Sequence, residues 1–355
     1  MIVCGMSGGV DSSVAAHLLT QQGEQVNGVF MRNWDEGDPE CRAEQDRMDA
    51  LRVCASLNIP FRVMDFSAVY RQQVFQSFLD GYARGTTPNP DILCNREVKF
   101  GVFLDAVLNA GAERLATGHY ARKGVRNGRA VLMRAVDPSK DQSYFLSAIS
   151  SEALACAEFP LGELPKSQVR QIARDAGLLT AGKKDSTGIC FIGERDFKDF
   201  LARYLPAQPG PIVDLEGRVV GTHQGALYYT VGQRAPVGGI KGGQAGPWFI
   251  AEKRVMQNTL VIVPGTDHPA LMTRHALTDV AHWIAGAPPA CVFNCQVQLR
   301  HLGQAHKASV SVDENGCALI EFIEPVRAVA PGQQAVFYQD EVCLGSGELQ
   351  APGLA

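Results

Sequence analysis

A short loop near the start of the chain combines residue types that bind phosphate. It spans residues 7–13 and reads Ser-Gly-Gly-Val-Asp-Ser-Ser. Glycines let the backbone approach an anion closely, hydroxyls add hydrogen-bond donors, and the helix that we expect to follow offers free N–H groups and a positive dipole. The loop lacks the lysine of the nucleotide-triphosphate P-loop and the glycine spacing of the dinucleotide loop. Asp11 could hold Mg²⁺ beside the bound phosphates.

Two of the ten cysteines lie where a thiol could be activated. Cys94 follows a rigid Pro-Asn-Pro turn, and we expect it near the start of a helix over residues 97–108. Helix starts and nearby cations lower the pKa of a thiol, and Asp91 could accept its proton. Cys190 follows shortly after a glycine and has basic residues on both sides. The other cysteines lie mostly in apolar runs, where a small buried side chain is the simpler interpretation.

The elements that must position these residues alternate between strand and helix in the first half of the chain. Periodic apolar residues predict strands at residues 2–4, 25–31, 61–66 and 114–117, and helices from Val10, over 42–57, around 75–82 and over 97–108. This order implies a Rossmann-like α/β domain, with a parallel sheet and helices on both faces. Ligands of such sheets bind at the carboxyl ends of the strands, where the phosphate loop would lie.

The second half of the chain is rich in predicted β-structure. The Asn127-Gly128 and Gln257-Asn258 pairs predict hairpins, and short alternating runs recur from Leu277 onward. A helix is expected over residues 166–178, and a cluster of Pro and Gly at 206–211 marks a boundary. We therefore expect an α/β domain over residues 1–205, a central β-rich domain over 206–275 and a C-terminal β-barrel over 276–355.

The composition restricts the class of protein. The 355 residues include 46% apolar and 20% charged side chains, enough for two or three domains with ordinary cores. A net charge of −4 excludes a strongly basic coat but not a local basic face. No apolar run approaches the roughly 18 residues of a membrane helix, and we expect no secretory signal. Scattered cysteines without a Cys-x-x-Cys pair argue against a structural zinc site and favour a cytoplasmic protein.

Several motifs resemble those of a single family when they are taken together and in order. The Ser-Gly-Gly-x-Asp-Ser loop resembles the PP-loop of the ATP pyrophosphatases, which cleave ATP between its α and β phosphates. Further motifs follow along the chain: PNPDILCNREVKF, ATGHYAR, KDQSYFL, STGICFIGER, VGQR and PGQQAVFY. With the loop, they are similar to those of the bacterial tRNA-specific 2-thiouridylases, the MnmA family, over nearly the whole chain.

The resemblance implies an ATP-dependent tRNA-uridine 2-sulfurtransferase. In this family the O2 atom of the wobble uridine takes the adenylyl group of ATP, pyrophosphate leaves, and a persulfide sulfur then displaces AMP. Cys190 would carry the persulfide, and Cys94 would be the partner nucleophile. Cys94 could release sulfide from Cys190 and leave a Cys94–Cys190 disulfide, or it could resolve a covalent adduct, and both routes stay open. The implied partners are tRNA and a persulfide donor protein, either a cysteine desulfurase or a relay carrier, with no membrane involved.

The same resemblance implies ATP and Mg²⁺ as cofactors, the ion being held with ATP and by Asp11 rather than by a protein-only cage. The implied ATP site comprises Gly5, Met6, Ser7, Gly8, Gly9, Val10, Asp11, Ser12, Met31 and Gly118. The implied target-base segment is Asn89, Pro90 and Asp91. The implied tRNA contacts are His119, Lys140, Asp141, Gln142, Arg300, His301 and Gln333. A core histidine is the alternative interpretation of His119, but its place just past the carboxyl end of a strand, beside Gly118, favours a functional role. Without the resemblance, residues 140–142 would be interpreted as a solvated helix start.

Two departures from the family pattern concern RNA binding rather than the reaction. His301 stands where the family often has tyrosine, so a stacking contact there would differ. After VGQR, the family usually has Lys-Gly-Leu-Gly, whereas this chain has Ala235-Pro236-Val237-Gly238 and lacks the basic residue.

Two other classes of protein share parts of this pattern. A PP-loop ligase or amidotransferase, of the argininosuccinate- or GMP-synthetase type, would use an amine or ammonia as nucleophile and would not need both cysteines. A non-catalytic RNA-binding protein with a vestigial loop would bind tRNA without releasing pyrophosphate.

Overall fold

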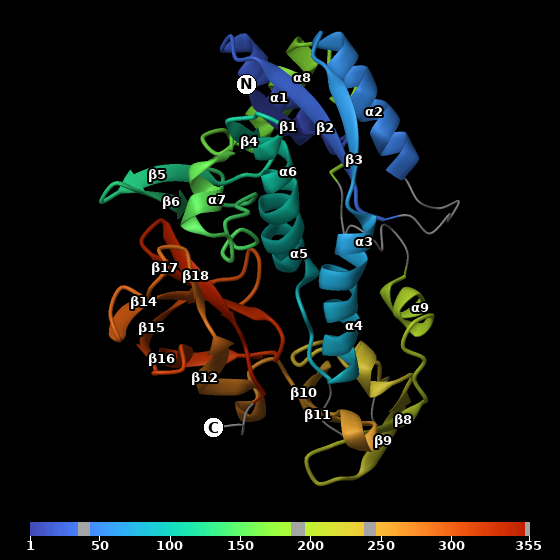
Figure 1. Cartoon of the computed structure of the whole chain (residues 1–355). Helices are drawn as coiled ribbons and strands as arrows, with labels where there is room; N and C mark the ends of the chain where they lie inside the picture. The colour runs from blue at the N-terminus through green and yellow to red at the C-terminus, as the bar shows by residue number, and fades with distance from the viewer. Residues whose placement is uncertain (35–42, 186–195, 238–245, 352–355) are drawn as a thin grey trace.

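The first half of the chain folds around a five-stranded sheet in which every pair of neighbouring strands is parallel (Figure 1). The computed structural model describes residues 1–34, 43–185, 196–237 and 246–351. The sheet has the order β3-β2-β1-β4-β7, and its strands are β1 (Ile2–Gly5), β2 (Val26–Arg32), β3 (Phe61–Asp65), β4 (Arg114–Ala116) and β7 (Ala157–Glu158). The predicted parallel α/β domain is confirmed, although the two-residue strand β7 was too short to be predicted.

Helices cover both faces of this sheet. One face packs on α1 (Val10–Gln21), α2 (Ala43–Ser56) and α8 (Lys166–Asp175). The other face packs on α6 (Leu104–Asn109) and α7 (Ser151–Ala155). None of the described helices is long and apolar enough to cross a membrane.

Two long helices extend from the sheet towards the rest of the molecule (Figure 1). The first comprises α3 (Ser67–Val69), η1 (Tyr70–Phe75) and α4 (Gln76–Ala83). The second comprises α5 (Pro90–Leu93), η2 (Cys94–Phe103) and α6, and in both helices the η segment has wider, π-helical turns. The second helix begins at Pro90, so the prediction of a start near residue 97 is wrong. Proline fits the first position of a helix, and the Asn89 side chain caps the helix by accepting the N–H of Asp91 at 3.2 Å.

The central part of the chain forms a four-stranded sheet beneath these helices. After α9 (Phe197–Ala202), the strands are β8 (Gly210–Val213), β9 (Val219–His223), β10 (Trp248–Arg254) and β11 (Thr259–Pro264), in the order β10-β11-β8-β9. Short turns of 3-10 helix lie at η3 (Ala226–Tyr228) and η4 (Val255–Gln257). Apolar residues of the sheet share one buried cluster with η1, α4 and the start of η2, so the central domain packs on the N-terminal half rather than standing apart.

The C-terminal part forms an antiparallel sheet that closes on itself. After η5 (Pro269–Leu271), its strands are β12 (Met272–Val280), β13 (His282–Trp283), β14 (Val292–Gln298), β15 (Ala305–Val312), β16 (Cys317–Arg327), β17 (Gln334–Gln339) and β18 (Val342–Glu348). They pair in the order β12-β16-β15-β14-β17-β18, and a bridge between Thr278 and Leu349 joins the first strand to the end of the last. The predicted β-barrel is confirmed.

A hairpin from the first half extends this barrel sheet. The strands β5 (Arg122–Arg126) and β6 (Arg129–Met133) meet at Asn127 and Gly128, which both have positive φ, as the sequence predicted. β6 then pairs with β18, so that Val342 lies opposite Met133. The hairpin therefore joins the N-terminal and C-terminal parts through backbone hydrogen bonds.

Candidate functional site

The phosphate loop has a conformation that only glycine permits at one position. Gly8 has φ +75°, and a Cβ at this residue would overlap the backbone carbonyl of Asp46. Ser12 and Ser13 turn their hydroxyls back to donate to the carbonyl of Gly9, at 3.2 and 2.8 Å. The N–H groups of the first turn of α1 have no carbonyl one turn earlier to bond, so they are available to an anion. The loop is thus shaped for phosphate.

Other predicted ATP-site residues lie at the same edge of the sheet. Met31 is near the carboxyl end of β2, and Gly118 follows β4, whose neighbour is β1. A Cβ on Gly118 would come within 2.7 Å of the backbone nitrogen of Ser12, so Gly118 packs directly on the phosphate loop. These positions are where parallel α/β sheets bind their ligands.

The carboxylate of Asp11 is surrounded by donors. Lys166 Nζ lies 2.7 and 2.8 Å from its two oxygens, and the Tyr120 hydroxyl donates to it at 2.7 Å. Lys166 also lies 2.9 Å from Asp185. Sequence reasoning missed Lys166 and Tyr120, because nothing in their local sequence distinguishes them from a helix-start lysine and a core tyrosine.

Asp185 collects positive charge next to this group. Lys140 Nζ lies 2.8 Å from its carboxylate and an Arg170 nitrogen lies 2.6 Å away. Burial opposes ionisation of Asp185, but hydrogen bonds and attraction from Lys140 and Lys166 outweigh it and lower the pKa of Asp185 to about 2. Lys140, predicted as a tRNA contact, is therefore held in an ion pair.

The Asn89–Asp91 turn faces residues from the barrel. Burial raises the pKa of Asp91, while positive charge on Lys99 and His301 acts in the opposite direction. His301 donates from Nε2 to the carbonyl of Asp141 at 2.9 Å, and its ring centroid lies 4.3 Å from that of Phe145. The structure thus brings His301 close to Asp91, although more than half the chain separates them in sequence.

Cys94 is 1% exposed and lies beyond the first turn of its helix. Cys94 is near the start of a helix, as predicted, but the helix begins four residues earlier at Pro90. The dipole effect on a side chain is confined to the first turn, so it contributes little at Cys94. Cys190 lies outside the described residues. The persulfide role of Cys190 and the Cys94–Cys190 disulfide therefore stay predictions.

The predicted tRNA contacts in the N-terminal half are largely engaged within the protein. Burial, then positive charge on Lys99, lowers the pKa of His119 well below its usual value, and its Nδ1 lies 2.8 Å from the Thr117 hydroxyl. Asp141 is buried and accepts from Arg134 and from the N–H of Ala135. Gln142 accepts the N–H of Tyr120 at 2.9 Å. These side chains shape the site from within.

Arg300 and Gln333 lie where the three parts of the molecule meet. Arg300 donates to the carbonyl of Val231 at 3.1 Å, and Gln333 Nε2 donates to the carbonyl of Thr87 at 2.6 Å. The two predicted tRNA contacts thus reach back from the barrel to a turn of the central domain and to the segment before Asn89.

Comparison with known proteins gives three family matches along the chain. Residues 1–194 match the tRNA methyl transferase HUP domain, residues 198–264 the tRNA methyl transferase PRC-barrel domain, and residues 273–349 the aminomethyltransferase beta-barrel domain. The first of these covers more than half of the 355 residues.

Curated relatives match almost the whole chain. The tRNA-specific 2-thiouridylase MnmA of Stenotrophomonas maltophilia (strain R551-3) is 52% identical, over 99% of this chain and 93% of the relative. The protein of the same name from Xanthomonas axonopodis pv. citri (strain 306) is also 52% identical, with the same coverage. A solved structure, that of the U34-tRNA thiolase NcsA from Methanococcus maripaludis, is 17% identical in sequence and superposes with a TM-score of 0.35. The match covers 57% of this chain and 63% of that chain. On the family match and the curated relatives, the chain belongs to the tRNA-specific 2-thiouridylase (MnmA) family.

Proposed function

We propose that this protein is an ATP-dependent tRNA 2-thiouridylase, which converts the wobble uridine of tRNA into 2-thiouridine and releases AMP and pyrophosphate. The observation that supports this most directly is a chain of neighbours from the phosphate loop to Asp91. Gly118 packs on Ser12 of the loop, His119 follows it, and Lys99 lies close enough to both His119 and Asp91 to shift the pKa of each. The nucleotide and the target base would then share one site.

The first proposed step is adenylation of the base. The O2 atom of uridine attacks the α-phosphorus of ATP, N3 loses its proton, and the bond to pyrophosphate breaks. The first-turn N–H groups and the positive end of α1 would hold the departing pyrophosphate. Asp91 is the candidate acceptor of the N3 proton, because burial raises the pKa of its carboxyl group.

The second proposed step transfers sulfur. The outer sulfur of a Cys190 persulfide attacks C2 and AMP leaves. The Cys94 thiolate then attacks the inner sulfur, which frees 2-thiouridine and leaves a Cys94–Cys190 disulfide. In the alternative order, Cys94 first releases sulfide, which attacks C2. Either order requires an external thiol to reduce the disulfide before the next turnover.

Mg²⁺ would be held by the phosphates of ATP together with Asp11, where it would neutralise charge on the pyrophosphate. Asp11 offers the right type of oxygen, but both of its oxygens are already bonded to Lys166 or Tyr120. The residues that the structure describes include no cluster of three or more His, Cys, Asp and Glu able to hold a metal by themselves. We therefore propose an ion that arrives with the nucleotide.

The proposal extends to domains, partners and compartment. Residues 1–205 would be the catalytic PP-loop domain, 206–275 the central domain and 276–355 the barrel, with the hairpin β5–β6 acting as part of the barrel. Arg300, His301 and Gln333 would lie on the tRNA side. A cysteine desulfurase or a relay carrier would supply the persulfide, and the reaction would take place in the cytoplasm.

Mass analysis of tRNA tests this function against its rivals. The protein is incubated with tRNA, ATP, Mg²⁺ and a sulfide source, and the tRNA is digested to nucleosides. We expect the mass increase of oxygen replaced by sulfur at the wobble uridine, with AMP and pyrophosphate formed in equal amounts. A ligase would release pyrophosphate without changing the tRNA, and an RNA-binding protein would retain tRNA without releasing pyrophosphate.

A further inference from the structure

Residues 85–87, which we call the junction segment, lie where the two later domains contact the chain just before the Asn89–Asp91 turn (Figure 1). Gly85 has φ +85°, and a Cβ there would come within 2.6 Å of Val255 in the central domain. From the barrel, Gly332 has φ +87°, and a Cβ there would come within 2.6 Å of the backbone nitrogen of Thr87. The Val255 side chain of the central domain and the Gly332 backbone of the barrel therefore both reach the junction segment at contact distance.

The polar groups of Thr87 are all bonded to residues of other domains. Its N–H donates to the carbonyl of Pro331 at 2.7 Å, and its own carbonyl accepts from Gln333 Nε2 at 2.6 Å. Its hydroxyl lies 3.2 Å from that of Thr230 in the central domain. The position of Thr87 is thus set from outside its own domain.

Lys253 adds a charged group at the same place. Its Nζ donates to the carbonyl of Tyr229 at 2.9 Å and lies 3.5 Å from the carbonyl of Thr86. The side chain is half-buried, and among the described residues no carboxylate pairs with it. A cation held by two carbonyls, one from the central domain and one from the junction segment, links the two.

We propose that Lys253 and Gln333 are positioning residues for thiolation: they fix the junction segment and, through it, hold the Asn89–Asp91 turn against the target uridine. This inference rests on the proposed function, and it gives Gln333 a role other than direct contact with tRNA. Reaction rates are sensitive to such positioning, since a misplacement of about 1 Å can cost roughly a hundredfold in rate. The turn that receives the base would then be placed correctly only when all three domains are assembled around it.

The position of Lys253 predicts a pH dependence with a defined sign. Burial lowers the pKa of Lys253 from 10.5 to about 8. Across the β10–β11 hairpin, Lys253 lies opposite Leu260. On β10 itself, Glu252 and Arg254 flank Lys253, point to the other face of the strand and pair with each other. The other titratable groups on the surrounding elements are Arg84, just before the junction segment, and the phenol of Tyr229, which lies beside Lys198.

Between pH about 8 and 10.5 the native protein loses this proton while the unfolded chain keeps it, so Lys253 contributes a gain in stability over that range. A neutral amine is nevertheless a weaker donor than an ammonium group. We therefore expect thiolation to fall above pH 8 without a loss of stability from this group.

The test compares four variants in single-turnover thiolation by persulfide-loaded enzyme at saturating tRNA and ATP. Lys253→Met and Gln333→Met should each lower the rate about tenfold, while the dissociation constant for tRNA changes less than about twofold. Lys253→Arg keeps a charged donor at all pH values used. Its thiolation rate should therefore equal that of the unmodified protein at pH 7 and should not fall above pH 8. Lys198→Met is the matched control: Lys198 contacts the ring and hydroxyl of Tyr229 rather than its carbonyl, and this variant should behave as the unmodified protein.

Hydrogen exchange separates this proposal from the proposed function. Without tRNA, the Thr87 amide should exchange faster in Lys253→Met and Gln333→Met than in Lys198→Met, with all three proteins folded by circular dichroism. Unchanged exchange at Thr87 in both variants would overturn the positioning role. So would weaker tRNA binding with an unchanged saturated rate, which would make Gln333 a direct contact. If the unmodified protein formed no 2-thiouridine, the proposed function would be refuted. Exchange at Thr87 would still show whether Lys253 and Gln333 fix the junction segment, because that measurement needs no tRNA.

Discussion

At the scale of single residues, Lys166 shares its charge between two carboxylates. It lies within hydrogen-bond distance of Asp11 in the phosphate loop and of Asp185 at the end of the described chain before residue 186. A Mg²⁺ ion that reached Asp11 with a nucleotide would weaken one of these pairs, and Asp185 would still neutralise Lys166. The arrangement therefore allows Asp11 to exchange partners without leaving a buried charge unpaired, which would be costly.

Asp11→Asn tests the role of this carboxylate. The amide keeps the size of the side chain but cannot neutralise Mg²⁺, so we expect pyrophosphate release to fall by about a hundredfold or more while tRNA retention on a filter is unchanged. The matched control is Asp80→Asn, since Asp80 is an exposed acid on α4 that accepts a hydrogen bond from Gln76 at 2.8 Å. Pyrophosphate release at the normal rate by Asp11→Asn would remove Asp11 from the mechanism.

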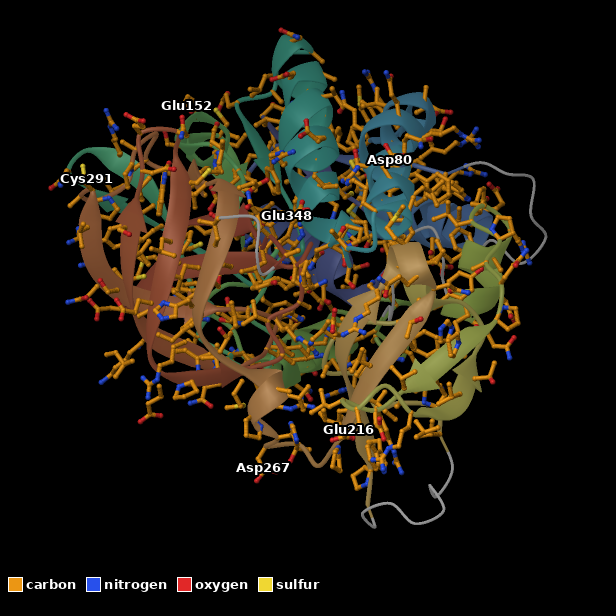
Figure 2. All side chains as sticks on the ribbon, turned by 90° about the horizontal axis from the view of Figure 1, so that it is seen from below. Asp80, Glu152, Glu216, Asp267, Cys291 and Glu348 are labelled. Atoms are coloured by element: carbon orange, nitrogen blue, oxygen red, sulfur yellow. The ribbon has the colours of Figure 1, made fainter. Side chains whose placement is uncertain are left out.

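The two predicted catalytic cysteines should fail at different steps. Cys190→Ser should not take up sulfur from the donor, because it lacks the thiol that forms the persulfide. Cys94→Ser should load sulfur but leave tRNA unmodified. Neither of these two variants should yield the Cys94–Cys190 disulfide in a non-reducing peptide map after one turnover, whereas the unmodified protein should. Cys291→Ser serves as the control, since Cys291 is exposed just before β14 of the C-terminal barrel (Figure 2), whereas Cys94 lies in the second long helix. Normal thiolation by Cys94→Ser would refute the resolving role.

At the scale of elements, the start of the second long helix decides where the Asn89–Asp91 turn, which we propose to bind the target base, points. Pro90 occupies the first helical position and Asn89 caps it, so the turn and Cys94 belong to one rigid unit. The sequence predicts a rigid turn at the two prolines and a helix only after them. The Asn-Pro-Asp order was in fact a helix-start pattern. The parallel strands and the Asn127-Gly128 hairpin were predictable, because their periodicity and turn chemistry are local.

Asn89→Ala tests the cap. Loss of a capping side chain typically lowers the free energy of unfolding by about 1 kcal/mol, and here it should also release the turn and lower the thiolation rate several-fold. Ser150→Ala is the matched control, because Ser150 caps α7 by accepting the N–H of Ala153 at 3.2 Å, away from the turn. Urea unfolding should show similar losses of stability in both variants, and only Asn89→Ala should lose activity. Equal thiolation rates in the two variants would show that the Asn89 cap does not affect the reaction.

At the scale of the whole molecule, the contacts that complete the site join distant parts of the chain, and these could not be predicted from the sequence. His301 from the barrel lies near enough for its charge to act on Asp91, Gln333 donates to the carbonyl of Thr87, and β6 pairs with β18. Each of these contacts depends on how three domains pack, and no local pattern of residues encodes that packing. The motifs supplied the candidate site residues, whereas the orientation of those that the structure describes, such as the inward-facing Asp141, follows only from the assembled structure.

The distribution of charge over the molecule is mixed rather than strongly basic. Seen from below, acidic side chains such as Glu152, Glu216 and Asp267 lie apart from one another across the surface (Figure 2). With a net charge of −4, binding of a polyanion requires a local group of cations. Arg300 and Arg327 form such a group: they donate to the carbonyls of Val231 and Gly232, and neither has a carboxylate partner among the described residues.

The affinity for tRNA should therefore depend on salt in a way that Arg300 changes. A few phosphate contacts predict that the logarithm of the binding constant falls linearly with the logarithm of the salt concentration, and Arg300→Gln should reduce that slope by about one. Arg129→Gln is the matched control, because Arg129 also donates to a backbone carbonyl, that of Ala285, but lies on β6 near the other edge of the sheet. Filter binding over a series of KCl concentrations measures all three slopes. An equal slope for Arg300→Gln and the unmodified protein would show that the tRNA phosphates are bound elsewhere, because each cation that lies against a phosphate adds to the slope through release of counterions. An affinity that does not change with salt would contradict phosphate contacts by cations altogether.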